Sequence, residues 1–139
     1  LGPTGYEPAA LTAELWAPAY VNAYFERGML LAESGFHQQA VDDLTKVIEL
    51  APQSNRKYAT QSHYNRGIIH LNQGRYELAL ADFSRVIEFM PGYGKAYSGR
   101  AIARFALDRN EGGCRDAQKA CEMGDCQWLE KARKDKLCP

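Results

Sequence analysis

Apolar side chains recur with the period of an α-helix along most of the 139-residue chain. Between residues 24 and 32, and again between residues 40 and 48, they stand three or four positions apart. This spacing places them on one face of a helix, so each segment predicts an amphipathic helix. Gly35 interrupts the pattern and predicts a turn between the two helices, and Pro52 predicts the end of the second.

The same helix pair returns along the chain. Gly28 reappears as Gly67 after 39 residues, and Ala101 takes this position after a further 34 residues. Small residues here allow the two helices of a pair to pack closely. In the third copy Gly113 replaces the alanine found at Ala79, and such degradation is typical of the last unit of an array. The sequence therefore predicts three helix pairs.

An arginine and an aspartate recur in every copy, sixteen residues apart. The guanidinium fork of arginine binds a carboxylate in two places, so we expect each pair to brace its helix hairpin. The alternative is that some of these arginines reach a ligand. The predicted structural pairs are Arg27 with Asp43, Arg66 with Asp82, and Arg100 with Asp116.

These features resemble the tetratricopeptide-repeat (TPR) family over about residues 20–127. The resemblance implies an all-α, right-handed α-solenoid of three TPR helix–turn–helix repeats plus a C-terminal capping helix. Two departures are evident. His63 stands where the other repeats have an aromatic residue, and the longer first spacing requires five extra residues within 53–59. The expected boundaries are 18–52, 56–91 and 94–125 for the repeats (18–125 together) and 126–139 for the cap with its tail.

The first residues of the chain do not follow the repeat. Residues 1–17 are expected to form an N-terminal extension, with a short helix over 9–16 as one option. Pro18 suits the first turn of the helix that follows, where its missing N–H leaves no bond unmade.

The resemblance to the TPR family implies a concave groove, lined by the first helix of each repeat, that receives a peptide or a partner helix. Members that clamp a C-terminal carboxylate use Lys, Asn and Arg at set positions, but this chain has Glu26 and Gly99 at two of them. Recognition of an EEVD-type terminus is therefore not expected. The predicted groove residues are Asn22, Phe25, Glu26, Met29, Tyr64, Asn65, Ile68, Asn72, Lys95 and Ile102.

All four cysteines follow residue 113, at Cys114, Cys121, Cys126 and Cys138. In a hairpin of the last repeat helix with the cap, a nested pairing of Cys114 with Cys138 and Cys121 with Cys126 is one of three connectivities. Free thiols and a metal site are the alternatives. This ending also resembles bacterial secreted or periplasmic TPR proteins. Asp125 is expected to cap the last helix.

Composition narrows the possible functions. Basic and acidic residues number 17 each, so the chain lacks the cationic footprint of a nucleic-acid-binding protein. No apolar stretch approaches the roughly 20 residues that cross a bilayer. The histidines show no metal-ligand spacing, and the chain lacks a phosphate-loop or nucleophile motif. We therefore expect no catalysis, cofactor or metal.

The expected function is binding of a protein or peptide in the groove, as an adaptor in the bacterial cell envelope. A periplasmic or secreted location follows from the cysteines and the family resemblance, with the cytoplasm as the alternative. Two other functions remain open. The chain could be a repeat domain cut from a larger protein that regulates or localises a neighbouring module, or a homo-oligomeric scaffold that self-associates.

Overall fold

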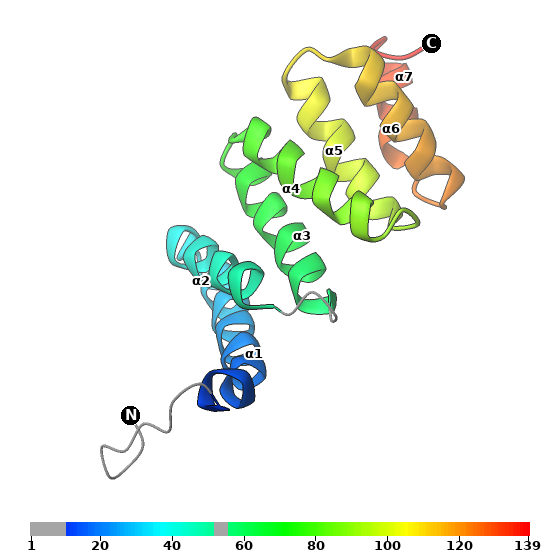
Figure 1. Cartoon of the computed structure of the whole chain (residues 1–139). Helices are drawn as coiled ribbons and strands as arrows, with labels where there is room; N and C mark the ends of the chain where they lie inside the picture. The colour runs from blue at the N-terminus through cyan, green and yellow to red at the C-terminus, as the bar shows by residue number, and fades with distance from the viewer. Residues whose placement is uncertain (1–10, 52–55) are drawn as a thin grey trace. The chain divides into compact units, whose positions relative to one another are not determined.

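The chain is an all-α helical repeat solenoid (Figure 1). The computed structural model describes residues 11–51 and 56–139, with side chains from Tyr20 onward, and every regular element in this part is a helix. None of the described helices is both long and apolar enough to span a membrane. The helices are α1 (Leu11–Glu33), α2 (His37–Leu50), α3 (Lys57–Asn72), α4 (Tyr76–Phe89), α5 (Gly94–Ala106), α6 (Asn110–Glu122) and α7 (Gln127–Lys134).

The chain divides into two compact units, residues 1–59 and residues 60–139. Unit 1 holds the hairpin of α1 and α2 together with the first turn of α3. Unit 2 holds the rest of α3 and all of α4 to α7. The hairpins predicted by the repeats are therefore α1–α2, α3–α4 and α5–α6, and α7 follows as the extra helix.

Glycine allows the sharp turn that ends a helix in three places. Gly35, Gly74 and Gly124 have φ angles of 82°, 70° and 96°, a left-handed backbone that glycine adopts without steric cost. At each turn the next N–H bonds back to the carbonyl five residues earlier, as Arg75 does to His70 at 2.8 Å. Asp108 occupies the same position after α5 with a φ of 57°, so the third repeat makes this turn without glycine.

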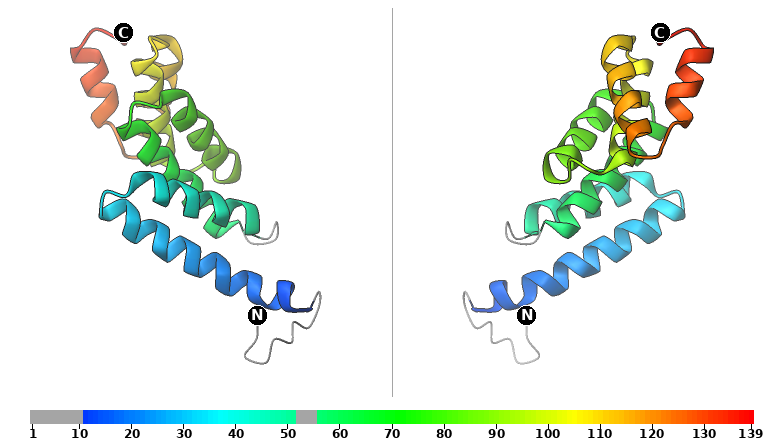
Figure 2. Two further views of the ribbon diagram at one scale, coloured as in Figure 1. Left: turned by 90° about the vertical axis from the view of Figure 1, so that its left-hand side faces the viewer. Right: turned by 90° about the vertical axis from the view of Figure 1, so that its right-hand side faces the viewer.

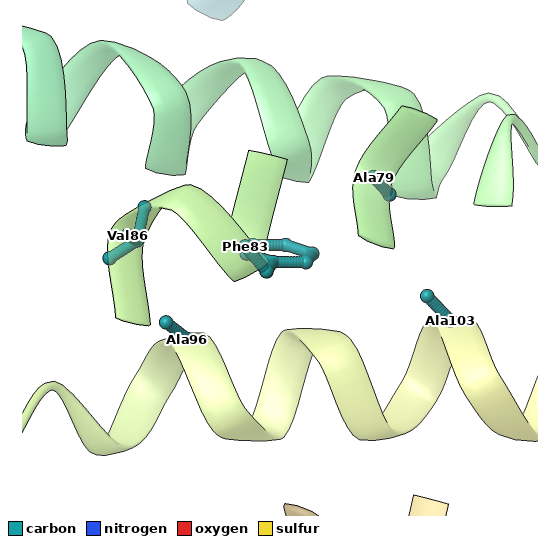
Figure 3. Close-up of a cluster of buried hydrophobic side chains, with 5 residues drawn as sticks. All are labelled: Ala79, Phe83, Val86, Ala96 and Ala103. Atoms are coloured by element: carbon teal, nitrogen blue, oxygen red, sulfur yellow. The ribbon is translucent and has the colours of Figure 1, made fainter. Parts of the chain in front are cut away.

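The core of unit 2 is centred on Phe83 of α4. Figure 3 shows its ring extending from α4 between α3 and α5, with Ala96 and Ala103 of α5 pointing toward α4. The Phe83 side chain is fully buried, and a Cβ added to Gly99 would lie 2.5 Å from its ring. Gly99 therefore leaves the space that this ring occupies.

In the α1–α2 hairpin of unit 1, a glycine again leaves room for a buried side chain of the neighbouring helix. Val21 of α1 and Leu44 and Val47 of α2 are almost completely buried. A Cβ added to Gly28 would lie 3.3 Å from both Asp43 and Leu44, which is tighter than ordinary van der Waals contact. The small residue thus sets how closely α1 approaches α2.

The structure corrects the expected start of the first helix. α1 runs without a break from Leu11, so its backbone passes through Pro18 instead of beginning there. A proline in a helix interior lacks the N–H donor and crowds the carbonyl four residues earlier, but α1 continues past Pro18 to Glu33. The rest of the predicted extension, residues 1–10, and the predicted stop at Pro52 lie outside the described residues.

The five extra residues before the second repeat are distributed over two places. α3 begins nine residues before Arg66, whereas α5 begins six residues before Arg100. Three extra residues therefore lengthen the start of α3, and the other two lengthen the connection that precedes it.

α7 is the cap of unit 2, and it lies beside the hairpin of α5 and α6 (Figure 2). Its buried residues are Leu129 and Ala132, and Leu129 packs with Ala101 and Ala117. The expectation that Asp125 caps this helix is wrong, because the N-cap residue is Cys126 and no side chain caps the helix. The Asp125 carboxylate instead accepts a hydrogen bond from the Ser98 hydroxyl at 2.5 Å.

The contact of Gly99 with Phe83 predicts how unit 2 responds to a small change. Gly99→Ala should lower the free energy of unfolding by about 1–3 kcal/mol, because the added methyl group would overlap the buried ring. Gly92→Ala is the matched control, since no atom lies within 4 Å of its added Cβ, and it should leave stability unchanged or slightly raised. Urea unfolding followed by circular dichroism measures both. Equal stabilities would contradict this packing.

Candidate functional site

A half-exposed stripe on α3 and α5 is the candidate binding face of unit 2. On α5 it follows Lys95, Ser98, Ile102 and Phe105, which are spaced so that they share one side of the helix. Lys95 is exposed, Ile102 and Phe105 are half-buried, and Ser98 is buried under Asp125. We call this stripe, together with its counterpart on α3, the unit 2 face.

The α3 half of the unit 2 face begins at Tyr64. Its ring meets the rings of Phe83 and Tyr93 edge to face, at centroid distances of 5.9 and 5.2 Å. Burial raises the pKa of the Tyr64 hydroxyl, and the nearby Tyr93 and Asp125 side chains raise it further by disfavouring a second negative charge. Tyr64 is therefore partly a packing residue, and the hydroxyl is a neutral donor at physiological pH.

Three more predicted groove residues complete this half of the face. Ile68 is half-buried and packs against the core around Phe83, and Asn72 is exposed at the end of α3. The Asn65 amide donates to the carbonyl of Gln61 at 2.8 Å, one turn back in its own helix. Asn65 thus has one donor already engaged, whereas Asn72 and Lys95 are exposed to solvent.

The predicted groove residues of unit 1 lie on α1. Asn22 and Glu26 are exposed, while Phe25 and Met29 are half-buried. The Asn22 amide oxygen accepts a hydrogen bond from the Tyr58 hydroxyl at 3.0 Å, and the Phe25 ring meets the Tyr58 ring at 5.4 Å. Two of the four residues are therefore in contact with the start of α3 within the same unit.

The unit 2 face offers few cationic partners for the C-terminal carboxylate of a bound peptide. A longer side chain at Gly99 would collide with Phe83, so the clamp arginine of related proteins has no room there. The Asp125 carboxylate, bonded to Ser98, places a negative charge one turn from Lys95. The geometry therefore disfavours a carboxylate clamp at this point.

Each predicted arginine reaches its aspartate through two hydrogen bonds. The N–O distances are 2.7 and 2.7 Å for Arg27 with Asp43, 2.9 and 2.7 Å for Arg66 with Asp82, and 2.9 and 2.8 Å for Arg100 with Asp116. In all three the aspartate is buried. The Arg27 side chain is 62% exposed, but those of Arg66 and Arg100 are 19% and 17% exposed.

The middle pair is part of a larger buried cluster. His63 Nδ1 lies 2.8 Å from Asp82 Oδ1, and His70 Nε2 lies 3.9 Å from Asp82 Oδ2. Burial alone would raise the pKa of the Asp82 carboxyl, but hydrogen bonds from His63 and Arg66 outweigh it and hold the pKa below its usual value. Asp82 is therefore ionised at neutral pH.

His70 faces this cluster without a complete set of partners. Burial lowers its pKa, and the positive charges of Arg66 and Arg75 lower it further, against the opposing pull of Asp82. Its Nδ1 is buried and makes no hydrogen bond. His70 is thus neutral at physiological pH, and a proton on it would be costly.

Two further contacts could not be foreseen from the repeat pattern. Arg104 adds a second guanidinium to Asp116, at 2.8 Å, so that the third pair is a triad. His63 takes the aromatic position of its repeat but bonds to the aspartate. In the other repeats Tyr24 and Tyr97 lie under Arg27 and Arg100, with guanidinium-to-ring distances of 5.5 and 5.7 Å. In the sequence, only the histidine at the position of Tyr24 and Tyr97 could have indicated this contact.

The four cysteines lie in two pairs at disulfide distance. Cys114 faces Cys138 with a Cα–Cα distance of 5.6 Å, and Cys121 faces Cys126 with one of 3.9 Å. Of the three connectivities, this is the nested one. Within the described part of the chain no group of three or more His, Cys, Asp or Glu side chains is placed to hold a metal ion.

A helix hairpin repeated along the chain and closed by an extra helix defines a helical repeat protein. Two family models, both described as "Tetratricopeptide repeat", match residues 21–54 and 60–93. The two matches start 39 residues apart, which is also the spacing of Gly28 and Gly67. The chain belongs to the tetratricopeptide-repeat family.

Solved structures of similar proteins have the same fold. MamA (residues 41 to the end) from Desulfovibrio magneticus RS-1 is 27% identical, covers 84% of this chain and 67% of its own, and gives a TM-score of 0.72. The first TPR of Spaghetti (RPAP3), solved with the HSP90 peptide SRMEEVD, is 24% identical over 86% and 90%, with a TM-score of 0.73.

A third similar structure is the Sgt2 TPR domain from Aspergillus fumigatus. It is 22% identical over 84% of this chain and 78% of its own, with a TM-score of 0.71. The likeness to the Spaghetti and Sgt2 domains shows the fold alone. No curated protein gives a significant sequence match.

The different burial of the ion pairs predicts unequal losses of stability. Arg66→Met should lower the free energy of unfolding by about 3 kcal/mol, because it leaves the buried Asp82 charge without its guanidinium. Arg27→Met is the matched variant and should cost much less, since water reaches the exposed guanidinium. Urea unfolding measures both, and a larger loss for Arg27→Met would contradict the bracing role of Arg66.

The histidine in this cluster predicts a dependence of stability on pH. The folded state binds a proton at His70 less readily than the unfolded chain, so stability should fall as the pH drops through about 6.5. Asp82, whose pKa is also lowered, adds a loss in stronger acid. His70→Asn should flatten the slope between about pH 7.5 and 5.5.

The control for that slope is His37→Asn, because His37 is exposed at the start of α2. It should keep the wild-type dependence. Unfolding midpoints in urea across the pH range give the measurement, and a His70→Asn slope equal to that of the wild type would exclude His70 as its origin.

Proposed function

We propose that the chain is a non-catalytic protein-binding module that takes an extended peptide or a partner helix on the unit 2 face. The observation that carries the proposal is the stripe of half-buried apolar residues, Ile68, Ile102 and Phe105, beside the exposed polar groups of Asn72 and Lys95. Such a face offers apolar area for affinity and polar groups that fix the register of a peptide.

The family supports this function. Tetratricopeptide repeats are interaction modules, and the similar Spaghetti domain was solved with a bound peptide. For this chain we propose a ligand that is not held by its C-terminal carboxylate. The Phe83 ring fills the space at Gly99 where a clamp arginine would stand, and the Asp125 carboxylate would repel an anionic terminus. The remaining groove residues of the sequence prediction, Asn22, Phe25, Glu26 and Met29, stay candidates for contacts made by unit 1.

The proposed place of action is an oxidising compartment such as the bacterial cell envelope, where the chain would serve as an adaptor. Two cysteine pairs at disulfide distance support it, since such bonds persist outside the reducing cytosol. A protein isolated from its source without reductant, and found with the mass of the fully reduced chain, would contradict this location.

Binding to the unit 2 face can be tested without knowing the natural partner. Peptides selected from a random display library should shift the backbone NMR signals of α3 and α5 more than those of α4 and α6. Lys95→Ala should weaken the selected peptides several-fold by removing the exposed cation. Lys119→Ala, on the exposed side of α6, is the matched control and should not weaken them. Signal shifts confined to α4 and α6 would overturn the proposal.

A further inference from the structure

An apolar pocket opens between α5 and α7. Ile102 and Phe105 of α5 form one wall, and nearly all of the lining surface is apolar. The Lys131 ammonium and the Asp135 carboxylate meet at 2.8 Å, and this ion pair lies on the opposite wall. The complete lining is Ile102, Phe105, Trp128, Lys131, Ala132, Asp135 and Leu137.

The size of the pocket limits what it can hold. Its volume is about 100 Å³. A cavity of about 150 Å³ lined by aliphatic and aromatic side chains accommodates benzene, so this pocket suits one aliphatic side chain and not a large aromatic ring. Since Ile102 and Phe105 belong to the unit 2 face, a peptide lying there could place such a side chain in the pocket.

The wall opposite α5 comes entirely from the segment after Cys126. Trp128, Lys131 and Ala132 belong to α7, and Asp135 and Leu137 belong to the tail that follows. The pocket therefore exists only while this segment lies against α5.

Two buried side chains and two cysteine pairs hold that segment. α7 has eight residues, of which Leu129 and Ala132 are buried, and a helix this short is not stable alone in water. The two cysteine pairs fasten it to α6 at both ends. Cys126, the N-cap of α7, is joined to Cys121, and Cys138, four residues beyond the helix, is joined to Cys114.

We propose that the pocket binds one aliphatic side chain of the partner peptide and that the two disulfides gate it by holding its α7 wall. This inference rests on the proposed function and adds the chemistry of the ligand and its regulation. In the oxidised chain the pocket is formed. In the reduced chain α7 separates from α5, and the anchor site is lost.

The redox step needs a dithiol as reductant. Each cysteine disulfide accepts two electrons and two protons and becomes two thiols, while the dithiol loses the same and closes to its own disulfide. The reduction of both pairs adds four hydrogens to the chain, so the intact mass reports the state of every sample. Cys121 and Cys126 are partly exposed, which gives a thiolate access to that pair.

The wall can be tested without any peptide. Hydrogen exchange of the α7 amides is measured with and without dithiothreitol, and Trp128 fluorescence is followed in a Trp16→Phe background that leaves one tryptophan. We expect reduction to abolish the protection of α7 and to shift the Trp128 emission to the red. Amides of α4, around Phe83, should stay protected. Unchanged protection of α7, or a loss of protection throughout unit 2, would overturn the inference.

The anchor is tested with display peptides selected on the oxidised chain. Reduction should weaken them about ten- to a hundredfold, the range expected for one buried aliphatic side chain. Replacing the peptide's aliphatic anchor by serine should weaken oxidised binding equally and leave reduced binding unchanged. The variant with all four cysteines replaced by serine should reproduce the reduced state without reductant.

The outcomes separate the two proposals. Peptides that shift α3 and α5 signals but bind both redox states equally would overturn the gated pocket and leave the proposed function standing. If no selected peptide contacts the unit 2 face, the proposed function fails, and the release of α7 is still decided by hydrogen exchange.

Discussion

The two helices of each repeat approach so closely that one position on the first helix can carry almost no side chain. At Gly28 and Gly67 an added Cβ would lie within 3.3 Å of the aspartate Cβ on the second helix. The arginine that binds this aspartate stands one residue before the glycine. Close packing and the ion pair are therefore consequences of one helix crossing, and the change of a single residue would disturb both.

The repeats could be predicted because two independent periods agree in the sequence. Apolar residues at helical spacing predicted the hairpins, and the small residue that returns at Gly28, Gly67 and Ala101 predicted their number. The arginine–aspartate contacts followed from that register. The start of α1 was placed too late because Pro18 is compatible both with a first turn and with an interior position that removes one hydrogen bond.

The contacts that no period governs could not be predicted. Asp125 was expected to cap α7, and its chemistry suits a cap, but it bonds to Ser98, which lies 27 residues earlier. His63 looked like a departure from the pattern, and only the position of Asp82 shows that it is a hydrogen-bond partner. The pocket depends on how α7 turns toward α5, which the sequence of a short, highly charged helix does not specify.

The nested pairing of the cysteines has a consequence for the order of assembly during synthesis. The first two hairpins carry no cysteine, so neither contributes a thiol that could pair wrongly during synthesis. Cys121 and Cys126 are only five residues apart, so the two thiols of this pair are synthesised almost together. The longer bridge joins residues 24 positions apart, so it must wait until both α6 and α7 have been synthesised, and it then fastens two complete helices together.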